Sequence, residues 1–152
     1  MIQLSLIYVG FTVLLAIVDA IRIKIVWGKK ANIDHNISFH LAVLFTAVAI
    51  ALYSIPLGLH LHMGPIKLAV VINAFGWPAC GLIRLSEYPV ALNFFRILTK
   101  TNPTGRIDYK SVSTSSSVDR LRWWNKLSFW QQRAVATTGW AVLIFLWYKL
   151  IE

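Results

Sequence analysis

Residues 2–23 read IQLSLIYVGFTVLLAIVDAIRI, and this run decides the fold. Its two charged residues, Asp19 and Arg22, both lie near its C-terminal end. A run of about 20 mostly apolar residues matches the helix length needed to cross the hydrocarbon core of a bilayer. The run therefore predicts a transmembrane helix. Because no basic residue precedes it, we expect a retained span and not a cleaved signal peptide.

Three further apolar runs follow at residues 38–59, 66–85 and 134–151. The chain of 152 residues is 57% hydrophobic and only 14% charged, with a mean hydropathy of +0.63. Ordinary soluble domains carry about 25% charged residues, so this composition argues against a soluble protein. We expect one all-α integral membrane domain over residues 1–152, a bundle of four transmembrane helices.

The long segment between the last two runs is polar or amphipathic. Residues 99–117 are rich in Ser, Thr, Gly and Pro, and the turn signal at residues 102–105 predicts a cytoplasmic loop. Residues 118–132 carry apolar side chains at near-helical spacing, which predicts an amphipathic interfacial helix leading into the fourth span. Pro89 is suited to start a second short interfacial helix.

The distribution of lysine and arginine predicts the orientation. Of the 15 basic residues, 13 lie in residues 22–30 and 84–133, and only Lys67 and Lys149 lie on the opposite side. Because basic loops remain cytoplasmic, we expect both termini on the non-cytoplasmic face of a bacterial inner membrane or a phage-related membrane. The net charge of +9 then indicates anionic lipids as partners, and no nucleic acid.

Four charged residues near the cytoplasmic end form a predicted intramembrane network. The first and third spans run in the same direction, so Asp19 and Arg84 lie at similar depth, and we expect them to pair. Arg22 and Glu87 lie one turn deeper, and we expect a second pair between them. The network either lines a gate or ion path, or is a structural clamp with arginines that reach toward the interface.

A polar stripe accompanies these charges on each of the two spans. Spacings of three and four residues place its members on one face of each helix. We expect the two stripes to face each other or a shared cavity, because unpaired polar groups are costly in hydrocarbon. The stripe comprises Ser5, Tyr8 and Thr12 on the first span, and Asn73, Trp77 and Cys80 on the third.

Tryptophans mark the expected membrane interfaces, where such amphipathic rings lie at headgroup level. The candidate anchors are Trp27, Trp123, Trp124 and Trp130. No metal site is expected, because the predicted topology separates the four histidines into two pairs and a zinc site needs three or four ligands. The sequence also holds no cofactor motif and no catalytic signature, so we expect no cofactor and no enzyme.

Three classes of function remain. The first is a non-catalytic structural, assembly or accessory subunit, and small residues on the third span support it because they allow close helix packing. The second is a homo-oligomeric pore, channel or small transporter, including a phage-type lysis pore, which the polar stripes and charges support. The third is a membrane enzyme or cofactor-binding subunit. The small residues are Ala74, Gly76, Ala79 and Gly81.

Overall fold

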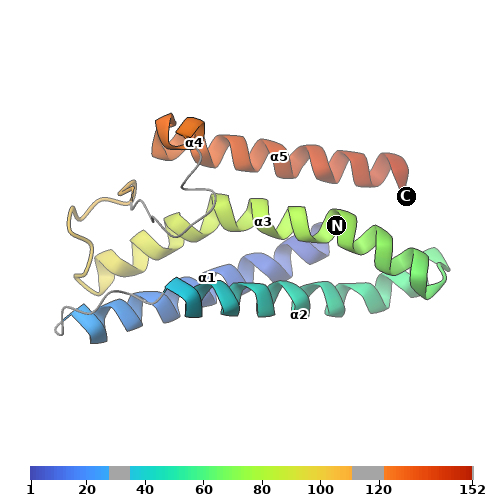
Figure 1. The fold of residues 1–152 in the computed structure, drawn as a ribbon, viewed down its shortest axis with the longest axis horizontal. Coiled ribbons are helices and arrows are strands. Elements are labelled where there is room, and N and C mark those ends of the chain that lie inside the picture. Colours follow the sequence, from blue (N-terminus) through green and yellow to red (C-terminus); the bar gives the residue numbers. More distant parts are fainter. Residues whose placement is uncertain (28–34, 111–121, 152) are drawn as a thin grey trace.

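The computed structural model describes residues 1–27, 35–110 and 122–151. Within these ranges all regular structure is helical, which confirms the all-α class. The four longer helices lie lengthwise beside one another, and the short α4 lies at the start of α5 (Figure 1). The helices are α1 (Ile2–Trp27), α2 (His35–Leu61), α3 (Pro65–Leu98), α4 (Arg122–Lys126) and α5 (Phe129–Leu150).

Three of these helices are long and apolar enough to cross a membrane. They are Ile2–Ile25, His40–Leu61 and Pro65–Leu98, with mean hydropathies of 2.3, 2.1 and 1.6. The helix α5 is not among them, although its 22 residues extend over about 33 Å. It carries Arg133 near its start and Lys149 near its end, and both charges lower its hydropathy.

The helix α3 differs from the sequence prediction. It continues for 34 residues through Pro78 and Pro89, whereas a span ending at residue 85 and a separate helix from Pro89 were expected. Contacts beyond Pro89 stabilise the last part of α3. Asn93 and Arg96 are buried there, and both donate hydrogen bonds to the loop that follows the helix. A helix of 34 residues is about 51 Å long, which exceeds a hydrocarbon core of about 30 Å.

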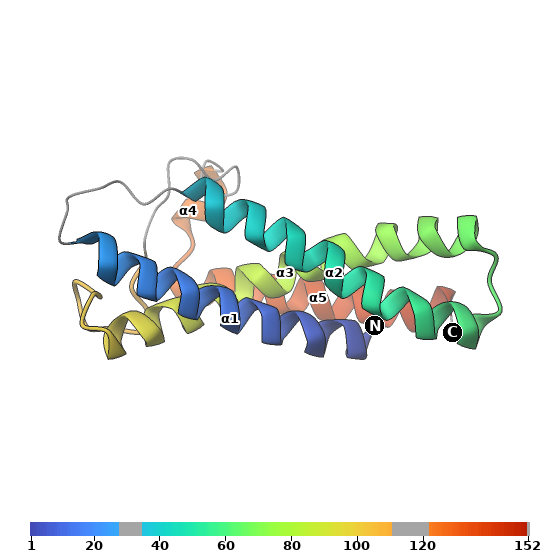
Figure 2. The same ribbon diagram turned by 90° about the horizontal axis from the view of Figure 1, so that it is seen from below.

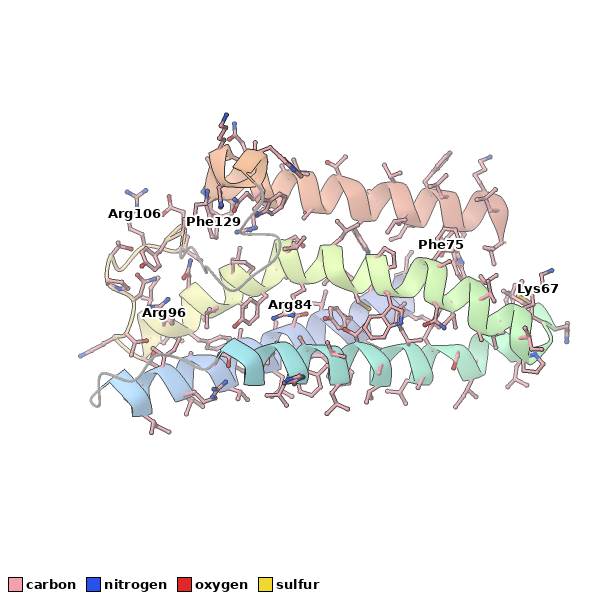
Figure 3. All side chains as sticks on the ribbon, in the orientation of Figure 1. Lys67, Phe75, Arg84, Arg96, Arg106 and Phe129 are labelled. Atoms are coloured by element: carbon pink, nitrogen blue, oxygen red, sulfur yellow. The ribbon has the colours of Figure 1, made fainter. Side chains whose placement is uncertain are left out.

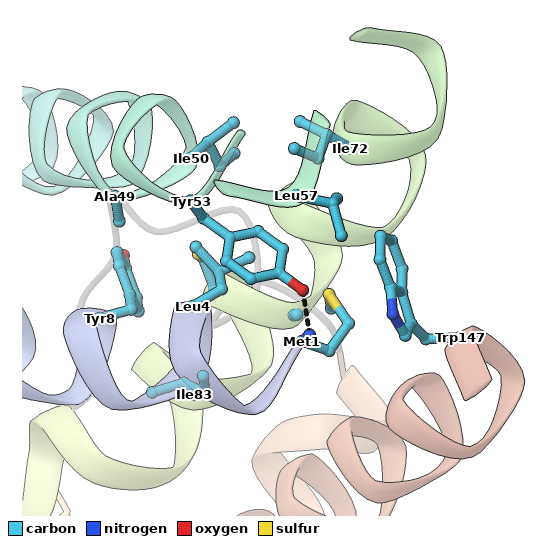
Figure 4. Close-up of a cluster of buried hydrophobic side chains, with 12 residues drawn as sticks. Met1, Leu4, Tyr8, Ala49, Ile50, Tyr53, Leu57, Ile72, Ile83 and Trp147 are labelled. Carbon is cyan, nitrogen blue, oxygen red and sulfur yellow. Dashed lines mark hydrogen bonds between the residues drawn. The ribbon is translucent and has the colours of Figure 1, made fainter. Parts of the chain in front are cut away.

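The four long helices share one apolar core. The helices α1 and α3 run in the same direction, α2 runs opposite to both, and α5 packs on α3 (Figures 1 and 2). Within the core, the Met1 amino group donates to the Tyr53 hydroxyl of α2 (Figure 4). Gly76 of α3 allows close approach, because an added Cβ would lie 3.2 Å from Ile50 Cγ1. The core cluster consists of Met1, Leu4, Tyr8, Ala49, Ile50, Tyr53, Leu57, Ile72, Ala79, Cys80, Ile83 and Trp147.

Residues 99–110, the described part of the loop expected over residues 99–117, are irregular and pack against the end of α3. Asn93 Nδ2 donates to the carbonyl oxygens of Ile107 and Tyr109, at 2.8 and 2.7 Å. Arg96 Nη2 donates to the Thr101 carbonyl at 3.2 Å, and its guanidinium lies 5.5 Å from the Tyr109 ring centre. The loop is therefore held by two buried side chains of α3.

The expected turn at residues 102–105 is present in this loop. The amides of Thr104 and Gly105 both donate to Asn102 Oδ1, at 3.0 and 3.1 Å. Gly105 has a φ of +64°, a left-handed conformation that glycine adopts without steric cost. This local pattern therefore follows directly from the sequence.

The predicted amphipathic helix over residues 118–132 is not continuous. Residues 111–121 lie outside the described ranges, α4 ends at Lys126, and α5 begins at Phe129. Ser128 causes the break, because its Oγ accepts from the Gln131 amide at 3.3 Å while Gln131 Oε1 accepts from the Ser128 amide at 2.8 Å. This reciprocal capping box starts a new helix at the site where a continuous one was expected.

Candidate functional site: a charge cluster between α1 and α3

The Asp19 carboxylate of α1 is the centre of the candidate site. Asp19 is 3% exposed, and its Oδ1 accepts a hydrogen bond from Arg22 Nη1 at 2.9 Å. Its Oδ2 accepts a hydrogen bond from the Tyr88 hydroxyl at 2.6 Å. Each carboxylate oxygen therefore has a strong donor, and the second donor joins α1 to α3.

Arg84 lies beside this cluster without joining its ion pair. Its Cζ lies 5.6 Å from the centre of the Tyr88 ring, within range of a cation–π interaction. Figure 3 shows Arg84 extending from α3 toward the side occupied by α1 and α2. Glu87 is exposed, and its Oε1 accepts from Ser86 Oγ at 3.0 Å. Among the described residues, neither Arg84 nor Glu87 forms an ion pair.

The two ion pairs expected between the helices are thus absent from the described part of the chain. Asp19 pairs with Arg22 of its own helix, because a spacing of three residues already brings these side chains together. Tyr88 occupies the place expected for Arg84, and a neutral donor avoids the cost of desolvating a second charge. Sequence reasoning missed Tyr88, which lies four residues after Arg84 on the same face of the helix, and spacing alone does not distinguish the two residues.

The polar residues of α1 are buried and bonded to two other helices. The hydroxyl of Tyr8 is hydrogen-bonded to Thr46 Oγ1 of α2 at 3.0 Å. Ser5 Oγ accepts from the indole nitrogen of Trp140 on α5 at 2.9 Å, and Thr12 Oγ1 donates to the Tyr8 carbonyl at 2.8 Å. This stripe therefore joins α1 to α2 and α5, whereas we expected it to face the stripe of α3 or a shared cavity.

The polar residues of α3 divide between two sides of the helix. Cys80 is fully buried, but Asn73 and Trp77 are exposed and bond to each other, Trp77 Nε1 donating to Asn73 Oδ1 at 2.8 Å. The remaining Asn73 contact is also local, to the Ala69 carbonyl at 2.7 Å. The expectation that this pair faces α1 is wrong, because the buried seam of α3 is displaced by one residue. That seam comprises Ile72, Gly76, Ala79, Ile83 and Ser86.

Two of the four candidate tryptophan anchors have largely exposed side chains. Trp123 is 55% exposed and Trp130 is 54% exposed. Trp124 is only 4% exposed and packs inside the protein. Its backbone carbonyl accepts a hydrogen bond from Gln132 Nε2 at 2.8 Å, which connects α4 to α5. Trp124 is therefore not a lipid-facing anchor. Trp27 is the last residue of α1, and its side chain lies outside the described part of the structure.

Within residues 1–27, 35–110 and 122–151, no three His, Cys, Asp or Glu residues gather into a possible metal site. Comparisons with protein-family models, curated proteins and solved structures find no match for the chain. Function is therefore inferred from the contacts of this chain alone. Three of those contacts are pairs of polar side chains that connect α1 to another helix: Tyr8 with Thr46, Asp19 with Tyr88, and Ser5 with Trp140.

Proposed function

We propose that this chain is a four-span membrane protein with a structural, assembly or accessory-subunit role and no catalytic activity. One observation carries the proposal: polar side chains inside the bundle are engaged with one another. Asp19 holds Arg22 and Tyr88, while Tyr8 and Thr46 share a hydrogen bond. An ion path needs polar groups that replace the hydration of a passing ion. Groups bound to each other across helices act instead as a clamp.

The proposed placement puts the basic end of the bundle in the cytoplasm and both termini on the other face. The end of α3, the loop 99–110 and α4 lie at one end of the bundle, which supports this orientation (Figure 1). In this placement α5 is the fourth span, and anionic lipids meet the basic end of a bacterial inner membrane or phage-related membrane. The described basic residues on that side of the chain are Arg22, Lys24, Arg84, Arg96, Lys100, Arg106, Lys110, Arg122, Lys126 and Arg133.

Cysteine labelling tests this placement. The native Cys80 is buried, so a Cys80→Ser background leaves single introduced thiols as the reporters. Pro103→Cys in the loop and His62→Cys in the α2–α3 turn both replace exposed residues at opposite ends of the bundle. A membrane-impermeant maleimide added to intact cells should label the thiol at position 62 and not the one at position 103. The reverse pattern would overturn the orientation.

The mass of the purified protein in native lipid tests the role. Mass photometry with single-particle images should show a monomer or a fixed complex with another chain. A closed ring of copies that also makes vesicles leak would refute the structural role. Purified protein reconstituted at the same density as an inert membrane protein provides the baseline for leakage.

A homo-oligomeric pore, channel or small transporter, including a phage-type lysis pore, is the second candidate. The Asn73–Trp77 pair favours it, because this polar pair faces outward from an apolar part of α3 and polar groups in such positions promote helix association. Induced expression should then arrest growth, and Asn73→Leu should relieve the arrest. Val70→Leu, at an exposed apolar position of the same helix, is the matched control.

A further inference from the structure

We propose that Arg84 binds the phosphate of an anionic lipid headgroup in the cytoplasmic leaflet. The inference rests on the proposed membrane placement and adds a defined ligand site to it. A guanidinium carries five N–H donors in a planar fork and remains charged at physiological pH. Such a charge inside a membrane helix is costly unless it meets a partner or reaches the interface.

The described residues around Arg84 do not supply an anionic partner. Both oxygens of Asp19 receive hydrogen bonds from other donors, Arg22 and Tyr88. Glu87 is exposed and accepts a hydrogen bond from Ser86. The close contact that Arg84 makes is with the Tyr88 ring, which is uncharged. Its N–H groups therefore remain available for an anion from outside the chain.

Tyr88 also directs Arg84 toward the headgroups. Arg84 lies 19 residues after Pro65, the first residue of α3, which corresponds to about 29 Å along the helix. This is close to the full thickness of a hydrocarbon core of about 30 Å. Tyr88 lies one turn nearer the cytoplasmic end, so a guanidinium held against its ring points toward that interface.

Phosphate oxygens suit this position. Arginine and phosphate form paired N–H···O bonds that match in both charge and geometry. The proposed orientation puts Arg84 on the leaflet where anionic lipids concentrate. A bound headgroup would neutralise Arg84 and would also close the cluster that joins α1 to α3 through Asp19.

Thermal unfolding of delipidated protein in a neutral detergent tests the site. Phosphatidylglycerol should raise the Tm by about 4 °C more than phosphatidylcholine with the same acyl chains, and Arg84→Gln should lose most of that difference. Arg106→Gln is the control for general attraction between the basic end and anionic lipids, because it removes the same charge from a largely exposed guanidinium in the loop, and it should lose a clearly smaller part of the difference. Hydrogen bonds to Asp108 raise the pKa of Arg106, so the control residue is charged in the wild type.

Further variants and ligands decide the interpretation. If Arg84→Gln does not fold, Arg84→Lys replaces it in the test, because lysine keeps the charge but lacks the planar guanidinium. The rise in Tm with phosphatidylglycerol should then be smaller than in the wild type. A separate measurement uses inorganic phosphate alone. If phosphate raises the Tm of the wild type but not of Arg84→Gln, Arg84 is an anion site whose ligand is a free anion and not a lipid headgroup.

An equal phosphatidylglycerol shift in the wild type and Arg84→Gln would overturn the proposal. A phosphatidylcholine shift as large as that of phosphatidylglycerol would do the same. If Arg84→Gln instead releases a co-purifying protein and leaves the lipid shift unchanged, the partner of Arg84 is a protein and the lipid site is wrong. A conducting ring of copies would refute the structural role without altering the lipid shift, so the two failures are distinguishable.

Discussion

Tyr88→Phe removes one hydroxyl and should weaken the contact between α1 and α3. The lost bond is 2.6 Å long and ends on the buried carboxylate of Asp19, which would keep its bond from Arg22. Hydrogen bonds between membrane helices average about 0.6 kcal/mol in double-mutant cycles, and bonds to a charged acceptor are roughly twice as strong. We therefore expect a loss of about 1–1.5 kcal/mol, which lowers the Tm by about 3–5 °C.

A double-mutant cycle with Asp19→Ala isolates this bond, because alanine has no acceptor for the Tyr88 hydroxyl. The free energy of unfolding would be measured in lipid nanodiscs for the wild type, both single variants and the double variant. A coupling energy of about 1 kcal/mol between positions 19 and 88 is expected. Tyr109→Phe is the control, because within the described residues no hydrogen bond of the Tyr109 hydroxyl is found. A coupling below about 0.3 kcal/mol, or an equal loss in the Tyr109 control, would refute the bridge between the helices.

Three further substitutions test the packing and the loop. Gly76→Val should cost about 1–3 kcal/mol, because the site already lies within 3.2 Å of Ile50, whereas Gly81→Val on the open side of α3 should change stability by less than about 0.5 kcal/mol in the same denaturation assay. Lys110→Met should remove two hydrogen bonds to backbone carbonyls at the end of α4, and amide hydrogen exchange in α4 should accelerate. Lys100→Gly should raise the free energy of unfolding by about 0.5 kcal/mol. The φ of +58° costs a lysine about 1 kcal/mol, and glycine removes this cost but gives the unfolded chain more freedom. A lower Tm of the glycine variant would contradict this expectation.

The sequence was most informative where the signal was local. The turn at residues 102–105 depends on an asparagine and a glycine within four residues of each other, and both behave as the pattern predicts. The break before α5 has a similar local cause in Ser128 and Gln131. That capping box was readable in the sequence, but the apolar spacing across residues 118–132 favoured a continuous helix. The prediction of a continuous helix relied on side-chain periodicity, which carries no information about where the backbone is capped.

Periodicity located the stripe on α3 but not the direction in which it faces. Each residue turns a helix by about 100°, so a stripe and the seam one residue before it have the same spacing and different neighbours. On α3 the buried residues include Ile72 and Gly76, whereas the predicted stripe held Asn73 and Trp77. A small residue beside a tryptophan gives the missing signal, because close packing between helices favours the smaller side chain.

The choice of Tyr88 over Arg84 as the partner of Asp19 lay beyond the sequence. Both residues are on α3, one turn apart, and depth alone favoured Arg84. The register between α1 and α3 decides the contact, and that register results from packing over the whole interface. A shift of one turn, about 5.4 Å, is enough to replace one partner by the other.

The polar contacts of α1 suggest how this register is fixed. Hydrocarbon does not drive apolar helices together as water does, so packing and directional bonds must select the arrangement in a membrane. Along α1, Ser5 contacts Trp140 of α5, Tyr8 contacts Thr46 of α2, and Asp19 contacts Tyr88 of α3. Three side chains at different depths along α1 thus each hold a different helix against it. A change at any one of them should loosen a single helix pair, and this separability is expected of a scaffold whose polar residues position helices.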